Sequence, residues 1–361
     1  MDFDRLFKAM VEQEASDLFL KVGTHPFLRI HGKLIPVGEE ALSKEELFDF
    51  ASDLMGPDRR QLFHAQRELN FAFERPGLGR FRANVLWQKG AMALVIRRIQ
   101  RMIPSFEELN LPGEVLSKAM AEAHGLILIT GPTGSGKSTT VSAMLDYLNR
   151  TIAKHIVTLE DPIEFHFEEG QCLINQREIG ADTRSFTEGL RNALRQNPDV
   201  LYVSDIRDRE TMEAALLAAE AGQLVLSCIH TTNVVNTIER VAAFFPAHQH
   251  HLIRLRLSLI LRAIVSLRLL LRADGTGRIP ACEILVATPT MRELIREGRT
   301  EQVPAALHDG AMYGMQTFTQ AFHRRYRQGE VTLEEVLRYA ESPDELQLAI
   351  REIHPTRDVE R

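Results

Sequence analysis

The segment Gly131-Pro-Thr-Gly-Ser-Gly-Lys-Ser138 limits what this chain can fold into more than any other part of the sequence. It has the spacing G-x-x-x-x-G-K-[ST], and it lies between an apolar run at 125–130 and a helix-like segment that continues to about Arg150. The glycines let the backbone turn tightly so that successive N–H groups face one anion, and the helix start adds a partial positive charge. The sequence therefore predicts a strand–turn–helix unit that binds the phosphates of a nucleotide.

The side chains of this turn predict how the nucleotide is held. Lys137 places an ammonium group on the terminal phosphates, and the Ser138 hydroxyl is a ligand for Mg²⁺. Thr139 either caps the helix or contacts the α-phosphate. We therefore expect ATP and Mg²⁺ as cofactors, with the nucleotide bound by Gly131, Thr133, Gly134, Ser135, Gly136, Lys137, Ser138 and Thr139.

Acidic residues follow two apolar runs, 155–159 and 200–203. The carboxyl ends of parallel strands share one edge of a sheet, where ligands bind. Asp205 is therefore the candidate carboxylate for Mg²⁺, and Glu160 or Glu164 is the candidate for polarising the attacking water. The sequence alone does not choose between the two glutamates.

His230 follows a third apolar run, 224–229. An imidazole at a strand end can sense a γ-phosphate through a hydrogen bond, and it can equally cap a helix or lie at the edge of a core. The residues themselves leave both readings open.

The order of the patterned segments predicts an α/β protein. Up to residue 100 we expect a small α+β domain, in which Ser43 and Glu46 have the capping-box spacing at the start of a helix. Two prolines and a glycine are typical of a linker, placed at 101–118, and the strand–helix alternation after it predicts a parallel sheet covered on both faces. The predicted domains are 1–100, 119–290 and a charged helical region, 291–361. Predicted helices lie at 4–15, from 43, 137–150, 186–196, 209–221 and 233–243, and predicted strands at 18–20, 27–31, 33–37, 69–73, 79–87, 91–99, 125–130, 155–159, 200–203, 224–229 and 281–287.

Composition narrows the class of protein. A length of 361 residues favours about two domains, and three cysteines far apart in sequence favour a reducing compartment over a disulfide framework. The net charge of −6 gives no overall attraction to nucleic acid. Arginines interrupt the most apolar stretch, 252–271, and the N-terminus does not resemble a signal peptide, so we expect a cytoplasmic protein without a transmembrane segment.

Taken together, the motifs resemble those of the secretion-superfamily ATPases, and within them the type IV pilus retraction ATPases of the PilT/PilU family. The resemblance covers nearly the whole chain. It rests on GPTGSGKST (131–139), TLEDPIEF (158–165), INQREIG (174–180), LYVSDIRDRET (201–211), LSCIHTTN (226–233), TPTMRELIREG (288–298) and GMQTFTQAF (314–322). Features such as VIRRIQ (95–100), SLILRAIVS (258–266) and the end of the chain favour the PilU side of the family.

The resemblance implies a homo-hexameric ring with a PAS-like N-terminal domain, a RecA-like P-loop ATPase domain and a helical C-terminal tail. It implies that Glu164 is the catalytic glutamate, that His230 lies near the γ-phosphate, and that Arg82 and Arg97 reach the nucleotide at a domain or subunit boundary. The implied location is the cytoplasmic face of the inner membrane, where an inner-membrane platform protein of the PilC type, and a paralogous PilT motor, would be partners. The implied output is pilus retraction and twitching motility.

Two departures from the family pattern motivate an alternative. Ser204-Asp205 stands where the family usually has Gly-Glu, and Ala221-Gly222-Gln223-Leu224 stands where it usually has Thr-Gly-His-Leu. Both departures predict slower turnover, so a weakly hydrolysing structural partner of another retraction motor is one alternative. A RecA-like nucleic-acid translocase, with the arginines between 254 and 278 lining a channel, is the other.

Overall fold

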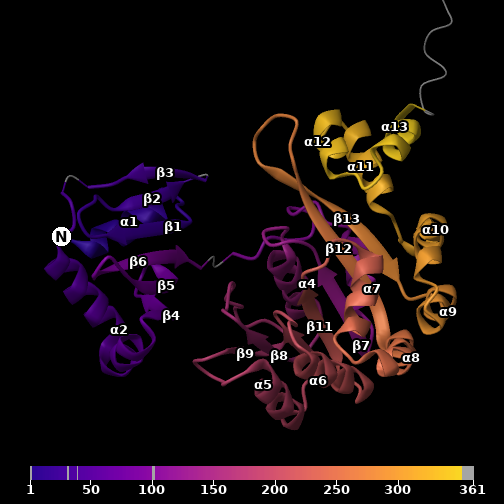
Figure 1. Ribbon diagram of the computed structural model, residues 1–361, viewed down its shortest axis with the longest axis horizontal. Helices are drawn as coiled ribbons and strands as arrows, with labels where there is room; N and C mark the ends of the chain where they lie inside the picture. Colours follow the sequence, from indigo (N-terminus) through magenta and orange to yellow (C-terminus); the bar gives the residue numbers. More distant parts are fainter. Residues whose placement is uncertain (1, 31, 39, 100–101, 352–361) are drawn as a thin grey trace, which may run out of the picture. The chain divides into compact units, whose positions relative to one another are not determined.

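The computed structural model describes residues 2–30, 32–38, 40–99 and 102–351. The chain divides into two compact units (Figure 1). One unit runs to Met102 and includes Glu164–His166, and the other comprises Ile103–Ile163 and the chain from Phe167 onward. Each unit has its own sheet and its own apolar core.

The first unit is built on a six-stranded sheet in the order β3-β2-β1-β6-β5-β4, with every neighbouring pair antiparallel. Alternating side chains give the sheet one apolar face, which carries Leu18, Val85 and Ile96 and packs with α1 and α2 into one core. The bounds are α1 Phe3–Glu12, β1 Asp17–Lys21, β2 Phe27–Ile30, β3 Lys33–Pro36, α2 Lys44–Gln66, β4 Glu68–Arg75, β5 Gly79–Gln88 and β6 Ala91–Arg98.

The predicted capping box at the start of α2 is confirmed. The Glu46 N–H donates to Ser43 Oγ at 3.2 Å, and the Ser43 N–H donates to Glu46 Oε2 at 3.0 Å. The predicted strands of this unit are all present, although position 31 of the predicted strand 27–31 lies outside the described residues. The predicted helix 4–15 ends earlier, at Glu12, because Glu14 takes a positive φ of 52°.

The second unit is built on a seven-stranded sheet in the order β13-β12-β7-β11-β10-β8-β9. All its pairs are parallel except β12 with β13. Every residue of β7 and β11 is buried, as expected of strands covered on both faces. The strand bounds are β7 Gly125–Thr130, β8 His155–Glu160, β9 Leu173–Glu178, β10 Val200–Val203, β11 Leu224–Ile229, β12 Leu261–Leu271 and β13 Arg278–Val286.

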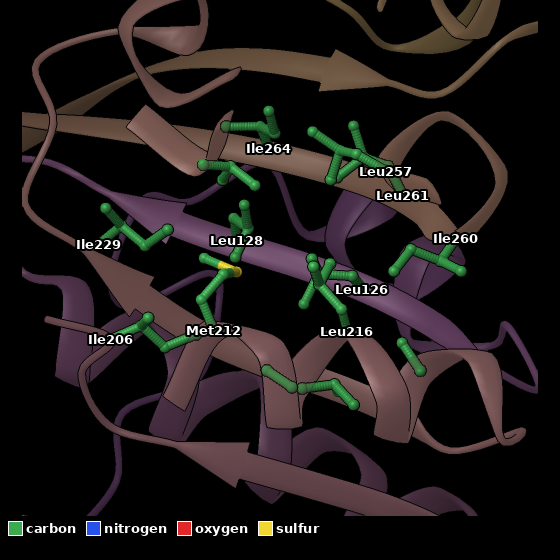
Figure 2. Close-up of a cluster of buried hydrophobic side chains, with 14 of the residues drawn as sticks. Leu126, Leu128, Ile206, Met212, Leu216, Ile229, Leu257, Ile260, Leu261 and Ile264 are labelled. Atoms are coloured by element: carbon green, nitrogen blue, oxygen red, sulfur yellow. The ribbon is translucent and has the colours of Figure 1, made fainter. Parts of the chain in front are cut away.

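Helices cover this sheet on both sides. Leu126 and Leu128 of β7 pack with Met212 and Leu216 of α6 and with Leu257 of α8 (Figure 2). The side chains between them alternate to the opposite face, and α4 packs against β7 and β11. The helix bounds are α3 Gly113–Met120, α4 Lys137–Thr151, α5 Phe186–Ala193, α6 Arg209–Glu220, α7 Val234–Ala243 and α8 His250–Ile260.

Two strands are absent from the sequence-based prediction. β9 is an edge strand with no buried apolar run, so its sequence lacks the usual strand signal. β12 lies within the apolar stretch 252–271, which divides between α8 and this strand at Leu261. The second half of the stretch is a strand and not a helix because it pairs with β7 on one side and with β13 on the other.

The arginines of this stretch are paired within the chain. Each lies within 3.2 Å of a glutamate carboxylate: Arg254 with Glu239, Arg256 with Glu213 and Glu220, Arg262 with Glu122, and Arg268 with Glu341. Their charge is therefore compensated locally, which counts against a row of arginines lining a nucleic-acid channel. No helix of the described part of the chain is long and apolar enough to cross a bilayer.

Helices follow the sheet, as the sequence predicts. They are α9 Pro289–Glu297, α10 Val303–Asp309, α11 Phe318–Arg327, α12 Leu333–Tyr339 and α13 Pro343–Arg351, and positions 352–361 of the predicted helical tail lie outside the described residues. Phe318 and Phe322 of α11 pack with Leu270 of β12 and Ile279 of β13. In the stretch predicted as a linker, α3 begins at Gly113, and position 101 lies outside the described residues.

Candidate functional site

The turn between β7 and α4 forms an open cradle of backbone amides. Gly131, Gly134 and Gly136 have φ values of 145°, 79° and 93°, which favour glycine. Gly136 is the N-cap of α4 and provides no side-chain hydrogen bond to the first turn. The first N–H groups of the helix are therefore left to bind an anion, and the helix dipole adds positive charge at the same point.

The turn is closely packed around its first glycine, Gly131. A Cβ atom at Gly131 would lie 2.4 Å from Ser135 Oγ and 2.6 Å from the Leu267 carbonyl oxygen of β12. Ser135 Oγ is itself buried and has no hydrogen-bond partner among the described residues. A buried hydroxyl without a partner is costly, and a phosphate oxygen in the cradle would satisfy it.

Lys137 bends back over this turn. Its Nζ donates to the Gly131 carbonyl at 2.9 Å and to the Pro132 carbonyl at 3.0 Å, and it lies 3.3 Å from His230 Nδ1. The side chain is buried, so the ammonium is held at the centre of the turn. From this position the ammonium group can bind the terminal phosphates of a nucleotide.

Asp205 lies two residues beyond the end of β10 and is also buried. Its Oδ2 accepts a hydrogen bond from Arg207 Nε at 2.6 Å and lies 3.2 Å from His230 Nε2. The hydrogen bond and charge of Asp205 raise the pKa of Arg207. The other carboxylate oxygen, Oδ1, is buried and has no hydrogen-bond partner among the described residues, so it is available to a ligand.

His230 connects these two residues. It follows β11, which lies between β7 and β10 in the sheet, so its ring reaches Lys137 on one side and Asp205 on the other. The structure thus brings together three of the predicted site residues. Arg207 was missed in the sequence prediction, although it lies two residues from Asp205 in the same charged run, SDIRDRE.

The two candidate glutamates have different surroundings. Glu160 ends β8 and is buried, and its Oε1 accepts hydrogen bonds from Thr158 Oγ1 at 2.6 Å and Gln176 Nε2 at 3.0 Å. Glu164 is exposed and follows the buried Ile163. The Asp161 N–H donates to Ser204 Oγ at 3.1 Å, which joins the segment that precedes Glu164 to the loop that carries Asp205.

Arg82 and Arg97 lie in the first unit and are direct cross-strand partners in β5 and β6. Residues opposite each other in an antiparallel pair present their side chains on the same face. Arg97 Nε donates to Asp17 Oδ1 at 2.8 Å. Arg82 makes no ion pair with any described residue.

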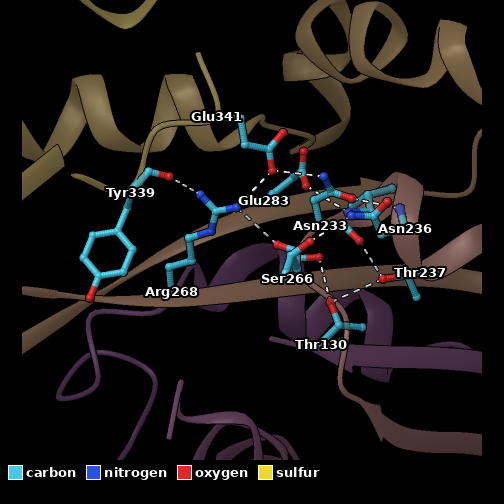
Figure 3. Close-up of polar contacts among 11 residues, drawn as sticks. Thr130, Asn233, Asn236, Thr237, Ser266, Arg268, Glu283, Tyr339 and Glu341 are labelled. Carbon is cyan, nitrogen blue, oxygen red and sulfur yellow. Dashed lines mark hydrogen bonds and ion pairs between the residues drawn. The ribbon is translucent and has the colours of Figure 1, made fainter. Parts of the chain in front are cut away.

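A polar network extends from the phosphate-binding turn to the C-terminal helices (Figure 3). Thr130, the last residue of β7, shares a 2.7 Å hydrogen bond with Ser266 of β12. The neighbouring Arg268 contacts the Tyr339 carbonyl and the Glu341 carboxylate, and Asn233, at the start of α7, donates to the same carboxylate at 2.9 Å. A cavity of about 460 Å³ adjoins this network and is lined by Pro132–Ser135, Thr232, Arg268, Leu269, Arg278 and Arg338–Glu341.

Comparison with known proteins places this site in a family. Residues 70–338 match the family described as type II/IV secretion system protein. The type IV pilus ATPase PilU of Pseudomonas aeruginosa is 40% identical over 351 residues, which cover 97% of this chain and 92% of that protein. The type IV pilus retraction ATPase PilT of the same organism is 41% identical over 344 residues, covering 95% of this chain and 99% of that protein.

The fold agrees with a solved relative. The crystal structure of the pilus retraction motor PilT with bound ADP superposes with a TM-score of 0.91 at 40% identity, covering 96% of this chain and 99% of that one. The predicted α/β fold and the predicted nucleotide-binding ATPase are thereby confirmed. Similar identities to PilU and PilT leave the choice between those two roles a prediction.

Proposed function

This chain belongs to the type II/IV secretion system protein family and, within it, to the PilT/PilU pilus retraction ATPases. We propose how its residues convert ATP hydrolysis into movement. The observation that carries the proposal is the contact chain Lys137–His230–Asp205 beside the glycine turn. These contacts connect Lys137, which is proposed to bind the terminal phosphates, to Asp205, the carboxylate that is proposed to bind the metal. The His230 imidazole can therefore respond to the γ-phosphate through Lys137 on one side and through Asp205 on the other.

The glycine turn and the first turn of α4 hold the phosphates in this proposal. The nucleotide contacts are Gly131, Thr133, Gly134, Ser135, Gly136, Lys137, Ser138 and Thr139. Ser138 and Asp205 would hold Mg²⁺. The buried Oδ1 of Asp205 has no hydrogen-bond partner among the residues that the structure describes, so it is suited to coordinate the metal. Among the described residues no group of three or more His, Cys, Asp or Glu side chains could bind a metal alone. A Mg²⁺ held by one carboxylate and the nucleotide phosphates, neutralising their charge, is the usual arrangement.

Hydrolysis requires an oriented water and stabilisation of the charge on the transferred phosphate. We assign the first task to Glu164, whose carboxylate is exposed, while that of Glu160 is buried and occupied by two hydrogen bonds. His230 detects the γ-phosphate. Arg82 and Arg97 supply guanidinium groups to the nucleotide, of the same or a neighbouring subunit. Such arginines are worth about 10³–10⁵ in rate in other NTPases.

Movement follows from a difference in affinity between two arrangements of the working domains. We propose 1–100 and 119–290 as these domains, connected by 101–118, with 291–361 as a helical region. ATP favours one arrangement and release of the γ-phosphate favours the other, because a ligand shifts such an equilibrium only through its differential affinity. In a homo-hexamer, successive changes around the ring would turn a PilC-type platform at the cytoplasmic face of the inner membrane.

Helix α9 is the proposed contact for that platform, because charged residues are concentrated along it and just beyond it, from Arg292 to Arg299. Arg292 itself is not part of this contact. Its guanidinium instead donates to the carbonyls of Ser258, Leu259, Leu261 and Ala287, and burial lowers its pKa. Arg292 therefore fastens α9 to the end of α8, and the contact surface is formed by Glu293, Arg296, Glu297 and Arg299.

One observation favours a second candidate function, a weakly hydrolysing partner of a PilT motor. Asp205 is one methylene shorter than glutamate, and its Oδ2 is already engaged by Arg207 and lies beside His230. Both features reduce what the carboxylate can offer to metal or water. Phosphate release should rise in Asp205→Glu if this candidate is right, and fall if the site is adapted to aspartate.

The primary experiment measures phosphate release by the purified chain at saturating Mg-ATP, with Lys137→Ala and Glu164→Ala as controls. We expect turnover that both substitutions abolish. Equal turnover in all three chains would refute the assigned site. A deletion strain complemented with wild type or with Lys137→Ala then tests surface motility, and full motility with the Lys137→Ala chain would contradict a motor role.

A further inference from the structure

Four charged residues form a row across the sheet of the first unit. Asp17 of β1 is the register partner of Arg29 in β2 on one side and of Arg97 in β6 on the other, and Arg97 is the partner of Arg82 in β5. Direct cross-strand partners lie on the same face. This face is opposite the apolar core formed by Leu18, Ala83 and Ile96, which alternate with the row.

The row has an excess of positive charge. It has three guanidinium groups and one carboxylate, and Arg82 stands directly opposite Arg97. Like charges in that relationship destabilise a sheet unless something compensates them. Among the residues that the structure describes, Arg82 has no ion-pair partner. The Arg82–Arg97 end of the row is therefore suited to an anion, as the proposed function requires.

Asp17 contacts the Arg97 guanidinium through a single nitrogen, Nε. It is 3% exposed, and its Oδ1 accepts from Arg97 Nε at 2.8 Å, while its Oδ2 accepts from Ser16 Oγ at 2.8 Å and lies 3.5 Å from Arg29 Nε. The Arg97 side chain is 67% exposed, and this Nε bond is its only hydrogen bond to a described side chain. The two terminal amino groups of the guanidinium therefore remain available for a ligand.

We propose that Asp17 is a positioning residue for Arg97. By accepting the hydrogen bond from Nε, Asp17 fixes the Arg97 guanidinium so that the two terminal amino groups of Arg97 meet the phosphates of ATP. This inference rests on the role proposed for Arg97. A planar guanidinium binds phosphate best with two parallel N–H donors, and its value depends on orientation. Because the buried Asp17 carboxylate already restricts rotation of the guanidinium, less conformational entropy is lost when Arg97 binds phosphate.

The test is a double-mutant cycle in the full chain, with Asp17→Asn, Arg97→Ala and the double variant. We expect Asp17→Asn to lower kcat about tenfold, as loss of a charge-assisted hydrogen bond would, with KM within about twofold. The double variant should turn over at the rate of Arg97→Ala alone, because Asp17 acts through Arg97. Asp4→Asn is the matched control, since it breaks the 2.9 Å Asp4–Arg75 pair of the same unit and should leave kcat unchanged.

Two results would overturn the proposal. One is an equal loss of kcat from Asp17→Asn with and without Arg97, and the other is an unchanged kcat in a variant of unchanged thermal stability. If Asp17→Asn does not fold, the same cycle is run with Asp17→Glu, whose displaced carboxylate should lower kcat only when Arg97 is present. Lys137→Ala separates the hypotheses: if it is inactive while Asp17→Asn matches wild type, the positioning role fails and the proposed ATPase site stands.

Discussion

His230 Nε2 lies 3.2 Å from Asp205 Oδ2, so the residue after β11 touches the carboxylate after β10. The other ring nitrogen, Nδ1, lies 3.3 Å from Lys137 Nζ. Because an ammonium group only donates hydrogen bonds, Nδ1 accepts and Nε2 carries the hydrogen toward Asp205. A single imidazole in this tautomer links the phosphate-binding turn to the proposed metal carboxylate.

Replacing His230 with alanine should therefore impair chemistry more than nucleotide binding. The amide cradle and Lys137 stay in place, so the Kd for a fluorescent ATP analogue should change less than about threefold. Loss of one preorganised polar contact to the transition state typically costs about 10²-fold or more in kcat. Phosphate release and analogue binding are measured on the same preparation. A kcat within twofold of wild type would contradict the sensing role.

The glycine turn offers a matched pair of substitutions. Gly131→Ala places a Cβ 2.6 Å from the backbone oxygen of Leu267, which cannot move away easily. Gly134→Ala meets no atom within 4 Å and carries only the strain of its positive φ, about 1–2 kcal/mol. We expect Gly131→Ala to abolish nucleotide binding and Gly134→Ala to weaken it, as measured by calorimetric titration with ADP. Equal affinities in the two variants would show that the close approach of β12 does not shape the turn.

Glu283 of β13 predicts a pH dependence of stability. Its burial raises its pKa from 4.5 to about 7, against the hydrogen bond donated by the Val234 N–H at the start of α7. The folded chain therefore binds more protons than the unfolded chain between pH 4.5 and pH 7, and the free energy of unfolding falls as pH rises through that window.

Glu283→Gln removes this ionisation and keeps an oxygen for the Val234 N–H. Relative to wild type, the variant should gain about 3 kcal/mol in free energy of unfolding between pH 4.5 and pH 7.5. Urea unfolding at both pH values provides the measurement. A difference between the two chains that does not change with pH would show that folding does not raise the pKa of Glu283.

Much of the fold follows from local pattern. Strands with apolar alternation, such as 79–87, and helices with a cap, such as the one after Ser43, are predicted because their signals lie within a few neighbouring residues. β9 escapes prediction because this edge strand lacks a buried apolar run. β12 escapes prediction because it depends on pairing with β7, which is distant in sequence. The division of one apolar stretch into α8 and β12 depends on β7 being present to pair with.

The phosphate-binding turn could be predicted from the amino-acid sequence, because glycine spacing and a helix start are local properties of residues 131–138. The apolar runs before Asp205 and His230 likewise predicted that both residues follow buried strands. The position of β11 between β7 and β10, which lets His230 contact both Lys137 and Asp205, became apparent from the folded chain alone. Strand order decides these contacts, because residues far apart in sequence meet only where pairing in the sheet brings their strand ends together.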